Sequence, residues 1–186
     1  NGDTEIQVSE ASAFSGRIDV YKKNITDLTG IAAFTAIKNL HCWGNQLTIL
    51  DVSKNTALNH LNCTDNQLTT LNLSKNTDLI SLDCAYNQLT TLNLSKNTAL
   101  TSLHCGNNQL TALNLSKNRD LEHLYCWRNQ LKRLDMSKNI NIKDIACENN
   151  KLKRVAVSKN MELIKLSCDN NQLKKLDVSK NIALKT

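Results

Sequence analysis

Seven cysteines recur at a fixed interval, and thiols can do chemistry that ordinary packing residues cannot. They can form disulfides, ligate a metal ion or act as nucleophiles. Two of them directly follow a histidine, in the pairs His41–Cys42 and His104–Cys105, an order that suggests a nucleophile and its base. The seven cysteines, each 21 residues from the next, are Cys42, Cys63, Cys84, Cys105, Cys126, Cys147 and Cys168.

The cysteines belong to a repeat that covers most of the 186 residues. Counted from each cysteine, apolar residues recur at −5, −2, +5, +8 and +10, and asparagines at +3 and +13. Each unit reads L-x-x-L-x-C-x-x-N-Q-L-x-x-L-x-L-S-K-N or a close variant. Self-similarity at this period predicts a solenoid, in which stacked units share one continuous core. In the unit that contains Cys63, the apolar positions are Leu58, Leu61, Leu68, Leu71 and Leu73.

The segment L-x-C alternates apolar and polar residues, so we expect a short strand there in every unit. Stacked units place these strands in a parallel sheet at a spacing of roughly 4.8 Å. Leu61 and Cys63 then point into the core, whereas His60, Asn62 and Thr64 point outward onto a concave face. We expect short extended or 3₁₀ segments on the convex side.

This pattern resembles the leucine-rich repeat of bacterial internalins, in the 21-residue cysteine-ladder variety known from internalin J. The resemblance implies an α/β-type leucine-rich-repeat solenoid over residues 17–186, with one 22-residue unit followed by seven 21-residue units. Val20 takes the cysteine position in the first unit. Residues 1–16 are expected to form a small helical N-terminal cap, with a helix that starts near Ser9.

The predicted geometry separates the possible roles of the cysteines. Neighbouring Cβ atoms would lie one strand spacing apart, beyond the roughly 3.8 Å that a disulfide prefers, and a single-file column cannot surround a metal ion. His41 and Cys42 would point to opposite faces and could not act as base and nucleophile. We therefore expect the thiols to pack as small apolar groups, as Val20 does, and we do not expect an enzyme.

The asparagines three residues after each cysteine are expected to form a second column, with their amides bonded to the backbone of adjacent coils. The lysines at +12 stack like charges along one edge, which is tolerable only in water. We assign that edge no role.

Residues that vary between units are the candidates for binding. The outward positions at −3, −1, +1 and +2 hold all four histidines, both tryptophans and two of the three tyrosines. Exposed Trp, Tyr and Arg anchor protein interfaces and stack on sugar rings, although such side chains also pack on their neighbours within a sheet. The candidates form a first group, His41, Trp43 and His60, and a middle group, Tyr86, His104, His123, Tyr125, Trp127 and Arg128.

A basic stripe is predicted at +6 and +7, where threonines of the early units give way to cations in the last three. Residues 119–186 hold 15 Lys/Arg against 8 Asp/Glu, a net of +7, whereas residues 1–118 hold 8 against 9, a net of −1. The stripe is either a solvated edge or a site for sulfated glycan or anionic cell-wall polymer. Its members are Lys132, Arg133, Lys153, Arg154, Lys174 and Lys175.

The first ten residues resemble the second half of an EF-hand calcium loop, with Asn1, Asp3, Glu5 and Glu10 at ligand positions. The first ligand position is missing, and Thr4 replaces the turn glycine. Calcium is therefore expected only if an upstream residue completes the loop, and no other cofactor is expected.

The most consistent function is a secreted or cell-surface module that binds a protein or glycan, as an adhesin does; this follows from the internalin resemblance. Nucleic acid is not expected as a partner, because no aromatic residues interleave with the basic stripe. No apolar run is long enough to cross a membrane. We expect a monomer from a longer protein, with the uncapped C-terminal edge open to association.

Overall fold

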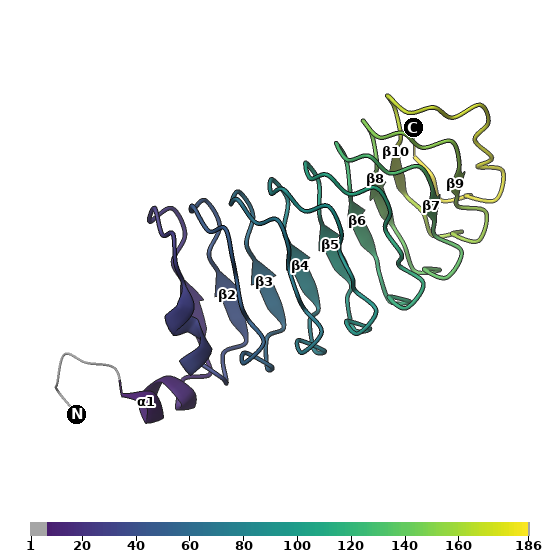
Figure 1. Cartoon of the computed structure of the whole chain (residues 1–186). Helices are drawn as coiled ribbons and strands as arrows, with labels where there is room; N and C mark the ends of the chain where they lie inside the picture. Colours follow the sequence, from purple (N-terminus) through teal and green to yellow (C-terminus); the bar gives the residue numbers. More distant parts are fainter. Residues whose placement is uncertain (1–6, 186) are drawn as a thin grey trace.

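Each repeat forms one coil of a solenoid in the computed structural model, which describes residues 7–185 (Figure 1). A parallel eight-stranded sheet lines the concave face in the order β1-β2-β3-β4-β5-β6-β8-β10. Successive coils pair in register, so that Leu61 of β3 lies between Leu40 and Leu82. The strands are β1 (Arg17–Asp19), β2 (Asn39–His41), β3 (His60–Asn62), β4 (Ser81–Asp83), β5 (Ser102–His104), β6 (His123–Tyr125), β8 (Asp144–Ala146) and β10 (Lys165–Ser167).

Each of these strands begins and ends one residue earlier than the L-x-C pattern predicts, so the cysteine directly follows the strand. Cys63 comes just after β3, yet its N–H still donates to Asp83 O on the next coil (2.8 Å), so the backbone ladder continues through it. Leu61 and Cys63 are both buried, as predicted. Val20 N–H likewise donates to His41 O (2.9 Å), which gives Val20 the place that the cysteines take in later coils.

The convex side consists of turns, the 3₁₀ helix η1 (Thr29–Ala33) and two short strands, β7 (Leu134–Asp135) and β9 (Val155–Ala156). These two strands pair in parallel as a separate sheet. Short extended and 3₁₀ segments were predicted here, and the structure confirms them. The core lies between the two sides and is filled by columns of leucine, including Leu58, Leu68 and Leu73.

The N-terminal helix α1 (Val8–Ala13) packs against η1. Gln7 occupies the N-cap position, and its N–H donates to the Glu10 carboxylate at 2.9 Å. The helix thus begins one residue before Ser9, where the sequence predicts its start, and Ser9 lies within the first turn and not at the N-cap. Among residues 7–185, no helix has the length and apolar character needed to cross a membrane.

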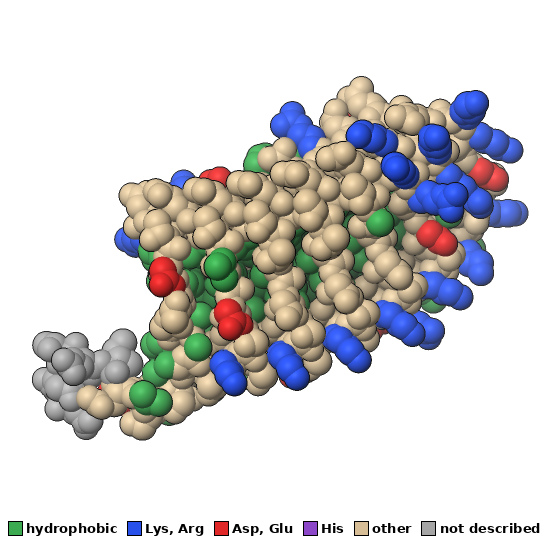
Figure 2. All heavy atoms as spheres, viewed as in Figure 1, with side chains coloured by type: hydrophobic (Ala, Val, Ile, Leu, Met, Phe, Trp, Pro, Cys, Tyr) green, Lys and Arg blue, Asp and Glu red, His purple; other side chains and the backbone are tan. Residues whose placement is uncertain are grey.

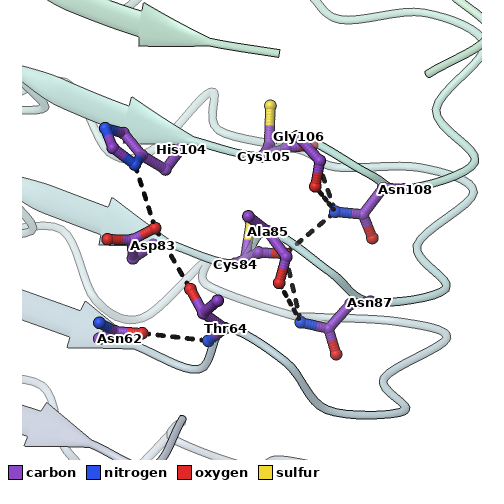
Figure 3. A network of polar contacts seen from close by, with 10 residues as sticks. All are labelled: Asn62, Thr64, Asp83, Cys84, Ala85, Asn87, His104, Cys105, Gly106 and Asn108. Atoms are coloured by element: carbon purple, nitrogen blue, oxygen red, sulfur yellow. Dashed lines mark hydrogen bonds and ion pairs between the residues drawn. The ribbon is translucent and has the colours of Figure 1, made fainter. Parts of the chain in front are cut away.

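The asparagines at +3 hold consecutive coils together, as predicted (Figure 3). Asn87 Nδ2 donates to Cys63 O of the preceding coil (3.0 Å) and to Cys84 O and Ala85 O of its own coil (both 3.2 Å). Its Oδ1 accepts the Leu68 N–H at 2.9 Å. One buried side chain thus satisfies polar backbone groups on two coils.

A second asparagine ladder, at +13, runs along the opposite turn of the coil. Asn97 is fully buried, and its Nδ2 donates to Leu73 O (3.0 Å) and Asn76 O (2.8 Å) of the preceding coil. The same pair of bonds recurs from coil to coil. The sequence shows this column of asparagines, but only the structure shows what it bonds.

Replacing Asn87 with alanine should destabilise the chain more than replacing Asn97. The first change removes partners from the Leu68 N–H and from carbonyls on two coils, so the free energy of unfolding should fall by about 3 kcal/mol, and Asn97→Ala should cost about half as much. Urea unfolding followed by circular dichroism measures both. Gln88→Ala, an exposed neighbour, is the control and should stay within about 0.5 kcal/mol of the unaltered chain. Equal losses at Asn87 and Gln88 would contradict the ladder.

Candidate functional site

The buried thiols are arranged for packing. All seven cysteines are free; six are buried, and Cys168 in the last coil is partly exposed. Burial raises the pKa of Cys42 and of Cys147 to about 12. His41 points outward from the strand that precedes the buried Cys42, and its Nδ1 lies 3.3 Å from Asp19 Oδ1. The histidine and the thiol thus lie on opposite faces, as predicted.

The centre of the concave face is an aromatic pair that spans three coils. Tyr86 and Trp127 meet edge to face, with ring centroids 5.3 Å apart and planes at 70°. They are two repeats apart, and Gly106 lies between them. A Cβ built on Gly106 would approach Trp127 Cε2 to 2.5 Å, so the indole lies directly on this glycine. A side chain at residue 106 would displace the indole, and with it the contact to Tyr86.

Tyr86 and Arg128, both beside Trp127, have left-handed backbone conformations that are unfavourable for bulky residues. The column at +2 lies in the left-handed region, where glycine, asparagine and aspartate are tolerated best. Five of its seven members are of those types. The exceptions among the cysteine-containing repeats are Tyr86 (φ 53°) and Arg128 (φ 48°), which both lie beside Trp127. Lys22 has the same conformation (φ 52°) at this position of the first coil. Strained residues cluster at functional sites, so these two mark a candidate site.

A polar network on the same face includes Thr64, Asp83 and His104 (Figure 3). The His104 ring packs edge to face on Tyr125, with centroids 4.1 Å apart. His104 Nδ1 lies 3.4 Å from Asp83 Oδ1, which also accepts the Thr64 hydroxyl at 3.2 Å. Partial burial, and then the charge of Asp144, raise the pKa of Tyr125. The side chains therefore support one another across four strands.

We call the set Tyr86, His104, Tyr125, Trp127 and Arg128 the aromatic patch. The Arg128 guanidinium lies 6.0 Å from the centre of the Trp127 ring, within the range of a cation–π contact. The Tyr86 side chain is exposed, and Tyr125 and Trp127 are half-buried, so the patch is both supported and accessible. The structure thus brings together five of the six residues predicted for the middle group.

His123, the sixth residue, belongs to a neighbouring ionic cluster. Its Nδ1 lies 2.8 Å from Asp144 Oδ2, and Glu122 Oε2 accepts a hydrogen bond from Lys143 Nζ at 2.7 Å. The hydrogen bond from Lys143, followed by its charge, lowers the pKa of Glu122. His123 is therefore held by its own partners on the rim of the aromatic patch.

In the first predicted group, His41, Trp43 and His60, the tryptophan packs against residues of the preceding coil. Tyr21 stacks on Trp43 with centroids 4.8 Å apart and planes at 5°, and Lys22 Nζ lies 4.8 Å from the Trp43 ring. Burial, and then the charge of Arg17, lower the pKa of His41. Trp43 thus already has partners within the chain.

Tyr21 was not among the predicted site residues. Because Val20 aligns with the cysteines, Tyr21 lies in the same +1 column as Trp43, and that alignment could have found it. His60 is exposed on β3, beside this group.

The remaining predicted sites lie away from the concave face. All six stripe residues are exposed on the edge that leads to the convex side, and Lys and Arg side chains gather over the C-terminal coils (Figure 2). Of the predicted calcium ligands, Asn1, Asp3 and Glu5 lie outside the described residues. Glu10 caps helix α1. Residues 7–185 contain no cluster of three or more His, Cys, Asp or Glu that could hold a metal ion.

Thiol labelling should distinguish one cysteine from the other six. Burial raises the pKa of the inner thiols, so little thiolate forms at pH 8, whereas Cys168 is partly exposed. Brief treatment of the folded chain with iodoacetamide should label Cys168 alone, and treatment in denaturant should label all seven. Mass spectrometry of tryptic peptides reads both. Rapid labelling of Cys105 in the folded chain would contradict a packed column.

Arg128→Asn should stabilise the chain by about 0.5–1 kcal/mol. Asparagine tolerates the left-handed conformation better than arginine does, and this gain exceeds the weak cation–π contact that is lost. Thermal or urea unfolding measures the change. Arg119→Asn, an exposed change outside the +2 column, should give no such gain. A loss of stability at residue 128 would show that no strain is stored there.

Comparisons with known proteins agree with the architecture. No protein-family model and no curated protein matches the chain. Among solved structures, the leucine-rich-repeat protein LIC12759 of Leptospira interrogans is 25% identical with a TM-score of 0.80, over 86% of this chain and 44% of that one. Internalin F of Listeria monocytogenes is 22% identical with a TM-score of 0.80, over 87% and 50%.

Internalin C2 of Listeria monocytogenes is 19% identical with a TM-score of 0.88, over 96% of this chain and 82% of that one. The chain spans about half the length of LIC12759 and of internalin F. These similarities are similarities of fold. The chain is a leucine-rich-repeat solenoid that resembles the Listeria internalins and carries a buried column of cysteines.

Proposed function

We propose that this chain is a binding module that recognises an extracellular protein or a glycan through the concave face, in the manner of an adhesin. The aromatic patch is the centre of the site. His123, His41, Trp43 and His60 extend it along the sheet. The internalin-like fold supports a role in macromolecular recognition and a place outside a bacterial cell, either secreted or on the surface.

The observation that carries this proposal is the left-handed backbone at Tyr86 and Arg128. The same column uses asparagine, aspartate or glycine in every other cysteine-containing repeat, so the scaffold does not require bulky side chains there. Both exceptions lie beside Trp127, and Gly106 makes room for its indole. A tyrosine, a tryptophan and an arginine held together on an exposed face are the residue types that dominate interface energetics.

The rigidity of the sheet also supports recognition. Each patch residue lies in a strand or within three residues of its end, where the backbone bonds between coils continue: Tyr86 N–H donates to Gly106 O (2.9 Å) and Arg128 N–H to Glu148 O (3.0 Å). Little conformational entropy therefore remains to be lost on binding. The buried thiols suit an extracellular place as well, because burial shields them from oxidants. A preorganised surface of this kind binds without a change of fold.

Alanine at both Tyr125 and Trp127 should abolish recognition and leave the fold intact. The change removes the Trp127 indole, which contacts Tyr86, and the Tyr125 ring, which packs on His104, so binding should weaken at least about a hundredfold. The native chain and the variant are compared on an array of extracellular proteins and glycans, and array ligands are then titrated by biolayer interferometry.

The matched control replaces two exposed apolar residues of the convex side, Ile140 and Met161, with alanine. This variant should keep every ligand of the native chain. If the Tyr125/Trp127 variant keeps the same ligands with unchanged affinity, the aromatic patch is not the site. Circular dichroism of all three proteins separates lost binding from lost structure.

A further inference from the structure

The basic stripe lies on a stretch of backbone that is organised differently from the same stretch in earlier repeats. Strands β7 and β9 form at the positions that directly follow Arg133 and Arg154. Lys153 N–H donates to Lys132 O (3.2 Å) and Leu134 N–H to Arg154 O (3.3 Å), so three of the six stripe residues, Lys132, Lys153 and Arg154, join the backbone ladder. The ladder holds their Cα atoms at the strand spacing of about 4.8 Å.

A groove opens where this ladder begins. β7 pairs only with β9, and on its other side a hollow of about 840 Å³ separates it from the preceding coil. Lys132, Arg133 and Lys138 line the hollow, together with Ser116 and Ser137. Asp135 also lines the hollow, so three cations and two hydroxyl groups stand against one carboxylate, and the net positive charge suits an oxyanion such as a sulfate or phosphate group.

The earlier repeats provide an internal comparison. The corresponding hollow between the second and third cysteine-containing repeats has a volume of about 210 Å³ and is rimmed at +7 by Thr70 and Thr91. Lys96 is the one cation that lines it. A hollow of about 430 Å³ between the first coil and the next has no lysine or arginine in its lining. Such hollows are therefore a general product of stacking, and the three cations are what distinguishes the one at the stripe.

The charges of the stripe are largely uncompensated. Within residues 7–185, none of the six cations forms an ion pair with a carboxylate. Two carboxylates lie nearby. A hydrogen bond from Ser137, and more weakly the charge of Arg154, lower the pKa of Asp135; hydrogen bonds from Ser179, and then Lys175, do the same at Asp177. Six cations against two carboxylates leave a line of positive potential over three coils.

We propose that the basic stripe binds a sulfated glycan chain, with one sulfate group held in the hollow at Lys132 and Arg133. The ligand is linear because the cations follow one line, and it is multiply charged because they extend over three coils. A glycan is favoured over nucleic acid because residues 128–186 contain no Phe, Tyr or Trp on which bases could stack. This site is separate from the aromatic patch and does not depend on the function proposed for it.

The test uses immobilised heparin and the intact chain. Each lysine and arginine of the stripe is replaced by threonine, the residue that Thr69 and Thr70 supply at these positions in the second repeat. Affinity at low salt should fall at least about tenfold, and the slope of log K against log salt should lose roughly 4–5 units if all six contacts are made. The variant carries Lys132→Thr, Arg133→Thr, Lys153→Thr, Arg154→Thr, Lys174→Thr and Lys175→Thr.

The control variant loses the same total charge elsewhere. Six exposed lysines of the +12 column are replaced by threonine, and heparin affinity should change less than threefold. An equal loss in both variants would show a non-specific charge effect and overturn the proposal. The control changes are Lys54→Thr, Lys75→Thr, Lys96→Thr, Lys117→Thr, Lys159→Thr and Lys180→Thr.

Two smaller variants test the hollow, and competitors test the ligand class. Lys132→Thr with Arg133→Thr should weaken heparin binding more than Lys174→Thr with Lys175→Thr, because only the first pair lines the hollow. Equal losses would overturn the sulfate position. Soluble heparin should displace the chain at lower charge concentration than single-stranded DNA or polyphosphate. Preference for either of those two would overturn the assignment to a sulfated glycan.

Discussion

The fold depends on a requirement of the backbone: the inward polar groups at the turn of every coil must find partners in an apolar interior. The asparagine at +3 meets this requirement with one amide. Asn87 bonds carbonyls of its own coil and the preceding one and accepts an N–H from that coil, so it sets both the shape of the turn and the distance between coils. The first unit is one residue longer, yet Asn45 still donates to Val20 O (2.8 Å) and accepts the Ile25 N–H (3.0 Å). The turn at the asparagine is therefore the constant part of the coil, and an extra residue is accommodated elsewhere in the unit.

In-register stacking turns every sequence position into a column, and this determines where function can arise. A residue that suits one coil is repeated at about 4.8 Å, so apolar columns become a core, while like charges or rings accumulate on the surface. The aromatic patch and the basic stripe are both departures from their columns. They lie on different sides of a rigid body, since the patch follows β4 to β6 and the stripe precedes β7 and β9. One ligand on each side can therefore be bound without competition.

The sequence predicts most of the fold because the positions that are apolar in every 21-residue repeat are the positions that are buried. Leu61 and Cys63 are buried where the alternation predicts, and Asn87 bonds the backbone of the adjacent coil. The sequence does not predict the left-handed turn at Tyr86, because a bulky residue at that position argues against such a turn rather than for it. It also does not predict the contact between Tyr86 and Trp127, since rings two repeats apart meet only because Gly106 has no side chain. The sequence predicts short extended segments on the convex side but not that β7 and β9 alone pair into a second sheet, because lysine and arginine at +6 and +7 carry no strong preference for strand.

The left-handed backbone at Tyr86 and Arg128 costs the fold stability, although both side chains belong to the proposed binding site. A left-handed arginine persists only because the ladder on both sides over-determines the backbone, so the conformation is imposed by the repeat and not chosen by the side chain. The scaffold thus tolerates a residue that costs it stability, and such residues are retained where they contribute elsewhere. It follows that the exposed columns can vary without loss of the fold, while the +3 asparagines and the core leucines cannot. The surface columns are therefore where one repeat can differ from the next at the least cost to the fold.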